Sequence, residues 1–126
     1  MYVIKVQSSF NAAHNLRGYR GKCEKLHGHN WKVEVEISSA ALDKNGMVLD
    51  FHVVKKQINR VLVKLDHSYL NSLAYFKKNN PTSEKIAEFI FFELKKLLKK
   101  KPCLLQAVWV WETETAAAIF SEKEHA

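Results

Sequence analysis

The feature that most limits the possible folds is a two-residue alternation that begins at the second residue. Between residues 2 and 14, mainly apolar or small side chains occupy the even positions, whereas the odd positions from 5 to 11 are polar. This period is typical of a β-strand with one buried face. The alternation returns from His29 to Ala41. The sequence therefore predicts two long strands in a sheet that is covered on one face.

The period changes after the second strand. We expect a turn at 43–46 and a short extended piece at 47–51. From there the apolar residues recur every three or four positions, which is typical of an amphipathic helix. Asp50 is a suitable N-cap, and we expect this helix to run to about Leu65.

A second helical pattern begins near the sequence NNPTSEK. Its N-cap is either Asn80, with Pro81 at the first helical position, or Thr82. Its apolar residues again recur every three or four positions, and we expect it to end near Lys100, before Pro102.

Two alternating segments, 104–112 and 115–120, close the chain and predict a β-hairpin. The expected order is β-β-α-α-β-β, an α+β fold with the helices on one face of an antiparallel sheet. The length of 126 residues and the lack of a linker or an internal repeat predict a single domain over 1–126.

The net charge of +7 raises the question of a nucleic-acid partner. Many of the positive charges are lysines at the end of the second helix, where they complement the helix dipole and stay solvated. The three tryptophans, Trp31, Trp109 and Trp111, alternate with small or apolar residues on predicted strands, which suits packing or subunit contact. We therefore expect no nucleic-acid partner.

The cysteine count and the hydropathy bear on where the protein works. Two cysteines eighty residues apart form no disulfide framework. The first fifteen residues have polar interruptions where a signal peptide needs an apolar core, and no apolar stretch approaches eighteen residues. These features predict a cytoplasmic protein with no membrane partner.

Three histidines lie in phase with the buried faces of the two long strands. His14 ends the first strand, His29 begins the second, and His27 joins them if the second strand begins two residues earlier. Side chains two positions apart on a strand point to the same side. Three imidazoles with an open position are the arrangement of a catalytic zinc site, whereas the alternative is a group of core histidines bonded within the fold.

The same loop holds a thiol and a carboxylate, in the sequence CEKLHGH. Cys23 could be a fourth ligand that closes a structural site, a base or nucleophile beside the metal, or a small buried residue. Glu24 would raise the pKa of the thiol. The spacing alone leaves these alternatives open. The surrounding segment 15–26 is rich in Arg and Lys, which suits a small polyanionic substrate.

Two further places carry candidate site residues. Asp66 can orient His67 and stabilise its protonated form, although a helix-end carboxylate beside a surface imidazole would look the same. Glu112 lies in phase with Val108 and Val110. A carboxylate on a burying face needs paired donors, and a guanine-like ring would supply two N–H groups.

Taken together, six segments resemble the family of 6-pyruvoyl-tetrahydropterin synthase and 6-carboxy-tetrahydropterin synthase over essentially the whole chain. They are, in the family's order, FNAAH, CEKLHGHN, LDFHVVK, LDHSYLN, NPTSE and VWETETA. The resemblance implies the tunnelling fold, in which β-β-α-α-β-β subunits join their sheets into a barrel, commonly as a homohexamer of two trimers.

The resemblance also assigns roles to residues. It implies zinc held by His14, His27 and His29, with Cys23 as the proton-abstracting base instead of a ligand. It implies that Asp66 and His67 relay protons and that Glu112 anchors the pterin ring. Thr82, Ser83 and Glu84 resemble the lining of the pterin pocket.

The implied substrate is 7,8-dihydroneopterin triphosphate. The resemblance is strongest to the bacterial branch that serves queuosine synthesis, a lyase that forms 6-carboxy-5,6,7,8-tetrahydropterin and releases acetaldehyde and triphosphate. One alternative is a 6-pyruvoyl-tetrahydropterin synthase. Another is a dual-purpose enzyme in which Glu24 supports side-chain cleavage to 6-hydroxymethyl-dihydropterin for folate. The non-enzymatic alternative is a zinc-stabilised binding module, with Cys23 completing a closed site and no use for Glu112.

Overall fold

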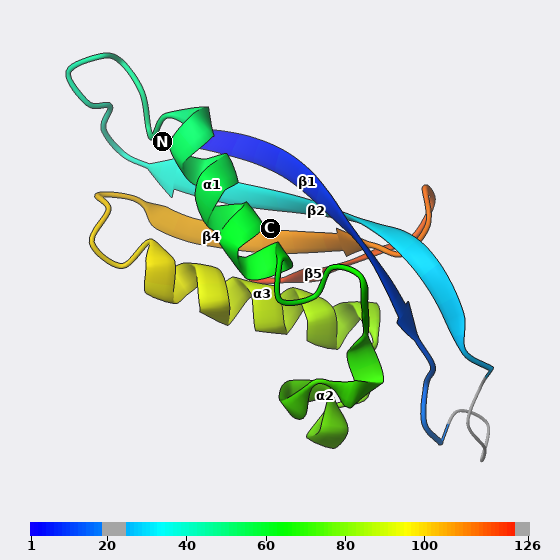
Figure 1. The fold of residues 1–126 in the computed structure, drawn as a ribbon. Helices are drawn as coiled ribbons and strands as arrows, with labels where there is room; N and C mark the ends of the chain where they lie inside the picture. The colour runs from blue at the N-terminus through cyan, green and yellow to red at the C-terminus, as the bar shows by residue number, and fades with distance from the viewer. Residues whose placement is uncertain (19–24, 123–126) are drawn as a thin grey trace.

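The computed structural model describes residues 1–18 and 25–122 (Figure 1). Two long strands, β1 (Tyr2–His14) and β2 (His27–Ser39), pair antiparallel along their whole length, from Tyr2 opposite Ser39 to His14 opposite His27. The expected alternation is confirmed in β1, where Val6, Phe10, Ala12 and His14 are buried. The second strand begins and ends two residues earlier than the expected 29–41, because its pairing with β1 sets its bounds.

The sheet has five strands in the order β3-β1-β2-β4-β5. The predicted hairpin is formed by β4 (Leu104–Trp111) and β5 (Ala117–Phe120), which are antiparallel. β3 (Ser68–Tyr69) runs parallel to β1 beside Ala12 and Ala13. A change of register between Glu36 and Ile37 marks a bulge where β2 pairs with β4.

The two predicted helices are present with clear N-caps. α1 (Phe51–Leu62) begins after Asp50, whose side chain accepts a hydrogen bond from the His52 N–H at 2.8 Å. α3 (Ser83–Leu97) begins after Thr82, whose hydroxyl accepts from the Lys85 N–H at 3.1 Å. Of the two caps considered for the second helix, the structure therefore selects Thr82. Both helices end three residues before the expected positions, Leu65 and Lys100.

Other short elements differ from the expectation. The turn at 43–46 is present, with the Gly46 N–H bonded to the Asp43 carbonyl at 2.9 Å. The expected extended piece at 47–51 is present only at Asp50, because Val48 and Leu49 form a bend and Phe51 already begins α1. β3, the 3-10 helix η2 (Leu70–Ser72) and α2 (Ala74–Lys78) were not expected. Elements of two to five residues are too short to show a hydrophobic period.

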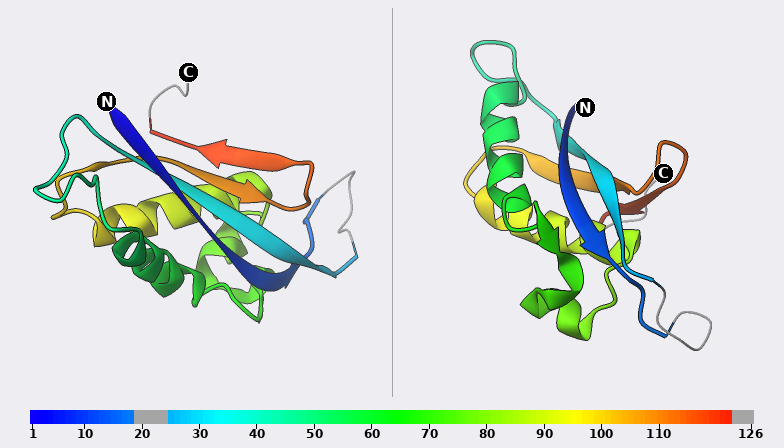
Figure 2. Two further views of the ribbon diagram at one scale, coloured as in Figure 1. Left: turned by 90° about the horizontal axis from the view of Figure 1, so that it is seen from above. Right: turned by 45° about the vertical axis from the view of Figure 1, so that its right-hand side comes forward.

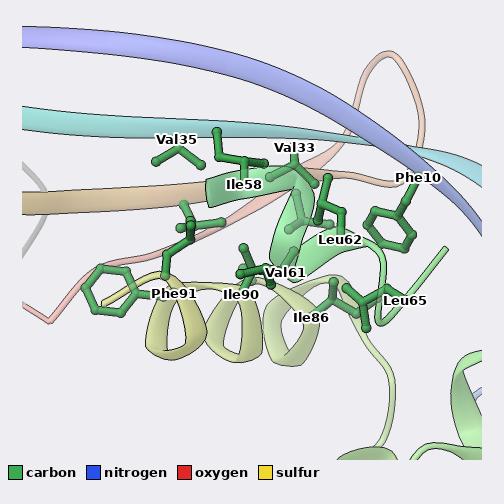
Figure 3. Packing of buried hydrophobic residues seen from close by; sticks show 14 of the residues in the cluster. Phe10, Val33, Val35, Ile58, Val61, Leu62, Leu65, Ile86, Ile90 and Phe91 are labelled. Atoms are coloured by element: carbon green, nitrogen blue, oxygen red, sulfur yellow. The ribbon is translucent and has the colours of Figure 1, made fainter. Parts of the chain in front are cut away.

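The core lies between the sheet and the helices α1 and α3 (Figures 2 and 3). Figure 3 shows Val33 and Val35 of the sheet near Ile58 of α1, Phe10 near Leu65, and Ile90 of α3 on the opposite side of the cluster. Each of these side chains is at most 1% exposed. Full burial of such a side chain contributes about 1.5–3 kcal/mol relative to leaving it in water. The expected α+β fold, with helices on one face of the sheet, is confirmed, but the parallel strand β3 makes the sheet mixed instead of purely antiparallel.

The opposite face of the sheet carries polar and aromatic side chains. Trp109 and Trp111 stack at 6.1 Å between ring centroids, and the ammonium groups of Lys5 and Lys32 lie 5.1 Å from these rings. Both ammonium groups also lie 3.5 Å from the Glu34 carboxylate. The lysine stems and the rings therefore shield one another on a face that no helix among the described residues covers. Within those residues, no helix combines the length and the apolarity that crossing a membrane requires.

Candidate metal and pterin site

Three histidines meet where β1 ends and β2 begins. His14 lies directly opposite His27 in the strand register, and His29 lies opposite Ala12. One ligand nitrogen from each of His14, His27 and His29 falls within 4.8 Å of the others. His14 is 1% exposed, whereas the other two are half-buried. The three residues that the sequence placed on one covered side are therefore brought together, and this histidine cluster could hold a metal ion.

Backbone carbonyls set the orientation of two of the rings. The Nδ1 atom of His14 lies 2.7 Å from the Pro81 oxygen, and the Nδ1 atom of His27 lies 2.9 Å from the Lys25 oxygen. A carbonyl oxygen only accepts, so each Nδ1 carries the proton and each Nε2 presents a lone pair. These Nε2 atoms are 3.0 Å apart. Two lone pairs that face each other at this distance repel, and a cation bound beside them would remove this repulsion.

His29 supplies a second sign that the cluster fits a cation. Its Nε2 atom is buried and, among the described residues, has no hydrogen-bond partner. A buried polar nitrogen without a partner is costly, and a bound ion would satisfy it. The ring packs edge-on to Trp31 at 5.2 Å, and so does the ring of His14 at 4.8 Å. The apolar ring of Trp31 therefore packs against two of the three imidazoles on their buried side.

The electrostatics favour the neutral, ligand form of His14. Burial lowers its pKa, and the neighbouring His27 and His29 lower it further, while the hydrogen bond to Pro81 and the charge of Glu112 oppose this shift. A neutral imidazole is the form that binds a metal. The donor set of three imidazoles suits zinc, among other divalent metals.

Glu112 follows β4 and faces the histidine cluster. Its carboxylate oxygens lie 3.5 Å from the Nε2 of His14 and 3.9 Å from the Nε2 of His29, and its side chain is 35% exposed. The Glu112 N–H bonds to the Ala116 carbonyl at 3.2 Å, which fixes the start of the turn into β5. The carboxylate therefore stands beside the cluster, where a bound molecule could reach both.

Asp66 and His67 lie at the outer edge of β1. One Asp66 oxygen accepts a hydrogen bond from the Asn11 N–H at 2.8 Å, and the other lies 3.4 Å from the His67 Nε2. The His67 side chain is 79% exposed, and its φ of 54° is left-handed, which is uncommon outside glycine. Among the described residues, no hydrogen bond, ion pair or ring contact joins His67 to the histidine cluster or to Glu112.

The segment NPTSE places the start of α3 against the cluster. Pro81 contacts His14 through its carbonyl, and Thr82 and Ser83 follow it directly. The Thr82 hydroxyl is used as the helix cap, and Glu84 in the first turn complements the helix dipole. The structure thus assigns Thr82 a structural task, while a pocket-lining role for Thr82, Ser83 and Glu84 stays a prediction.

Cys23 and Glu24 lie outside the described residues, as do the two positive residues Arg20 and Lys22 of the same loop. Arg17 is described, and its guanidinium donates to the Phe76 carbonyl. A hollow of about 530 Å³ on the uncovered face is lined by Asn30, Lys32, Trp111, Thr113 and Glu114, and not by the histidines.

Several residues at the site were not anticipated from the sequence. The carbonyls of Pro81 and Lys25 act through the backbone, so their side chains give no signal. The amides of Asn71 and Asn80 bond the chain just beyond His14. The only sequence signal for them is their position inside two of the six recognised segments, LDHSYLN and NPTSE.

Comparison with known proteins gives consistent matches over nearly the whole chain. The family model described as 6-pyruvoyl tetrahydropterin synthase matches residues 3–123. A 6-carboxy-5,6,7,8-tetrahydropterin synthase of Synechocystis sp. is 39% identical over 123 residues, covering 94% of this chain and 92% of its own. The protein of the same name from Haemophilus influenzae is 32% identical over 144 residues, covering 97% and 100%.

A solved structure shares the fold. The structure of Caenorhabditis elegans 6-pyruvoyl tetrahydropterin synthase superimposes with a TM-score of 0.84 at 25% sequence identity, covering 97% of this chain and 96% of that chain. The expected tunnelling fold is thereby confirmed for the subunit.

Proposed function

Because the chain belongs to the 6-pyruvoyl tetrahydropterin synthase family, we propose that it is a lyase that converts 7,8-dihydroneopterin triphosphate to 6-carboxy-5,6,7,8-tetrahydropterin. One water is consumed and acetaldehyde and triphosphate leave in this reaction, which would serve queuosine synthesis. The carboxylate of Glu112 beside the three imidazoles is the observation that carries the proposal. It combines a place for a metal with an acceptor for the ring of the substrate.

Each group of the site has a task in this proposal. Glu112 accepts two N–H bonds from the pterin ring and so fixes the ring beside the histidine cluster. His14, His27 and His29 would hold zinc, which would supply the Lewis acid that polarises the side-chain hydroxyls and so makes the adjacent C–H more acidic. Cys23, as its thiolate, removes that proton. The start of α3, at Thr82, Ser83 and Glu84, lines the pocket next to the ring.

Asp66 and His67 complete the proton transfers as a relay. The imidazole of His67 is largely exposed, and an Asp66 carboxylate oxygen lies 3.4 Å from its Nε2. Since the described contacts of His67 do not reach the cluster of its own chain, we propose that the relay serves the site of another copy. This fits the expected homohexamer of two trimers, in which the His67 of each copy would lie at the site of a neighbouring copy.

Product analysis tests the proposal. The purified, zinc-loaded protein should consume 7,8-dihydroneopterin triphosphate and release 6-carboxy-5,6,7,8-tetrahydropterin, acetaldehyde and triphosphate in equal amounts. Accumulation of 6-pyruvoyl-tetrahydropterin would instead assign it to the other activity of the family. A zinc-loaded protein without turnover would support a binding module.

A second activity is favoured by the adjacent Cys23 and Glu24. Glu24 could act as the base for cleavage to 6-hydroxymethyl-dihydropterin, a folate precursor. Cys23→Ala should then abolish the 6-carboxy product and spare some of this cleavage, while Glu24→Ala should do the reverse. If Glu24→Ala changes neither product, Glu24 is a loop residue without a catalytic task.

A further inference from the structure

After His14, where β1 ends, the backbone of the chain is hydrogen-bonded by two amide side chains and not by a neighbouring strand. The N–H of Asn15 donates to the Asn71 amide oxygen at 3.0 Å, and the Asn71 amide nitrogen donates to the Asn15 carbonyl at 2.8 Å. Asn80 does the same for Arg17, with distances of 2.8 Å and 3.1 Å. One amide thus satisfies both backbone groups of each residue.

These bonds continue a regular pattern along the edge of β1. Upstream, the Asn11 N–H donates to Asp66 and the Asn11 carbonyl accepts from the His67 N–H at 2.6 Å. β3 then pairs with Ala12 and Ala13. The edge is therefore bonded at Asn11, along β3, and again at the two residues that the amides hold. In a strand, alternate residues face the same edge, so the two amides extend the ladder that β3 begins.

An amide side chain can extend such a ladder at both groups of a residue. It presents one acceptor oxygen and an NH2 donor side by side, as the edge of a peptide does. A carboxylate of the same shape accepts but does not donate, so it would leave one carbonyl without its donor and place two oxygens against each other. Asn71 is only 8% exposed, so water cannot readily replace the lost bond.

The ladder meets the histidine cluster on both sides of His14. Asn15 follows His14 directly in the chain. Pro81 follows Asn80 directly, and its carbonyl accepts the proton of the His14 Nδ1 at 2.7 Å. Moving either amide would therefore shift the backbone that carries His14 or the carbonyl that orients its ring.

We propose that Asn71 and Asn80 are positioning residues that hold His14 in the orientation in which its Nε2 binds the metal. The inference deepens the proposed function, because it rests on His14 being a metal ligand. Groups that orient a metal-bound histidine typically change metal affinity by 10–100-fold when they are replaced.

The test compares Asn71→Asp and Asn80→Asp with Asn59→Asp. All three changes keep the shape and add one negative charge. The Asn59 oxygen only accepts, from the Ser8 hydroxyl at 2.8 Å, so Asn59→Asp keeps its bond. Zinc affinity, measured by competition with a chelating indicator, should fall about tenfold or more in the two ladder variants and stay unchanged in the control.

A second control separates positioning from general loss of stability. Ile58→Val removes a methyl group from the core, where Ile58 is fully buried, away from the ladder. It should lower the melting temperature of the metal-free protein without lowering zinc affinity. If Asn71→Asp does not fold by circular dichroism, Asn80→Asp, whose residue is only partly buried, still decides the question.

The proposal is overturned if every folded variant among Asn71→Asp and Asn80→Asp binds zinc as tightly as Asn59→Asp does, whatever its melting temperature. The proposed reaction fails separately, by a lack of turnover in the unmodified protein. Zinc affinity is measured without substrate, so the two failures are distinguishable.

Discussion

At the scale of single residues, the histidine cluster is arranged for a cation by groups that are not ligands. The carbonyls of Pro81 and Lys25 place the protons of two rings on the side away from the cluster, and Trp31 packs against two of the imidazoles on their buried side. The rings of His14 and His27 are therefore already oriented before an ion binds. Preorganised ligands lose less conformational freedom on binding, which favours tight binding.

The role of Cys23 is tested by its removal. Cys23→Ala should keep about one zinc ion per subunit, because three imidazoles suffice to hold it, and should lose nearly all turnover. Metal analysis and steady-state kinetics on the same preparation give both numbers. His27→Ala is the matched control and should lose the metal. Loss of zinc from Cys23→Ala would make the thiol a ligand instead of a base.

Glu112→Gln tests the anchor of the ring. A charged hydrogen bond contributes about 1.5–3 kcal/mol, and the amide presents a donor where the ring also donates, so substrate affinity should fall by at least tenfold. The melting temperature should change little, because the side chain is one third exposed. Glu114→Gln, two residues along on the exposed turn, should leave affinity unchanged. Equal affinity in both variants would remove Glu112 from the site.

The candidate ligands could be predicted from single residues because the strand period places side chains. His14, His27 and His29 share a phase with buried apolar residues, and this phase alone brings them to one side of the sheet. The carbonyl of Pro81 and the amides of Asn71 and Asn80 could not be predicted in this way. They act from a segment without periodicity, and their partners are more than fifty residues away along the chain.

At the scale of elements, the long strands and the two capped helices followed from local chemistry. Asp50 is the cap that the sequence indicates, and Thr82 is one of its two candidates for α3. The elements between the two helices could not be predicted from local chemistry, because β3, η2 and α2 depend on tertiary contacts such as the pairing of β3 with β1. A strand of two residues forms only where a longer strand supplies hydrogen-bonding partners at its edge.

The two caps offer a test of the start of α3. Asp50→Ala and Thr82→Ala should each lower the free energy of unfolding by about 1 kcal/mol, since each removes a side-chain acceptor from a helix N–H. Only Thr82→Ala should also raise the KM for 7,8-dihydroneopterin triphosphate, if Thr82 lines the pocket. Denaturant titration and kinetics of both variants decide this. An unchanged KM for Thr82→Ala would leave the residue its capping task alone.

At the scale of the whole molecule, the parts of the proposed site are distributed over the chain. The cluster and Glu112 lie together at one end of the sheet, whereas His67 is exposed at the outer edge of β1. Under the proposed function, a single copy would therefore hold a metal site and a ring anchor, and no described hydrogen bond, ion pair or ring contact links them to the proposed relay. Assembly with other copies is the simplest way to complete the site.

Mixing inactive subunits tests this arrangement. Cys23→Ala and His67→Ala should each be inactive alone. If the thiol and the imidazole of one site come from different copies, unfolding and refolding the two together should restore activity to about a quarter of the sites, because partners combine at random in a symmetric oligomer. A mixture that stays inactive, although it reassembles to the same size, would place both groups in one copy.

The continuous register of β1 has a further consequence for its outer edge. The backbone N–H and C=O of Asn11 point away from β2, towards Asp66 and His67. Because the direction alternates along a strand, the backbone groups of Ser9, Gln7, Lys5 and Val3 point to the same outer edge. Among the described residues, no strand covers this stretch. Its amide protons should therefore exchange with deuterium within seconds in a dilute, dissociated subunit. If the proposed assembly pairs a second strand with this edge, the exchange should slow by orders of magnitude, and its rate would then measure the assembled fraction of the protein.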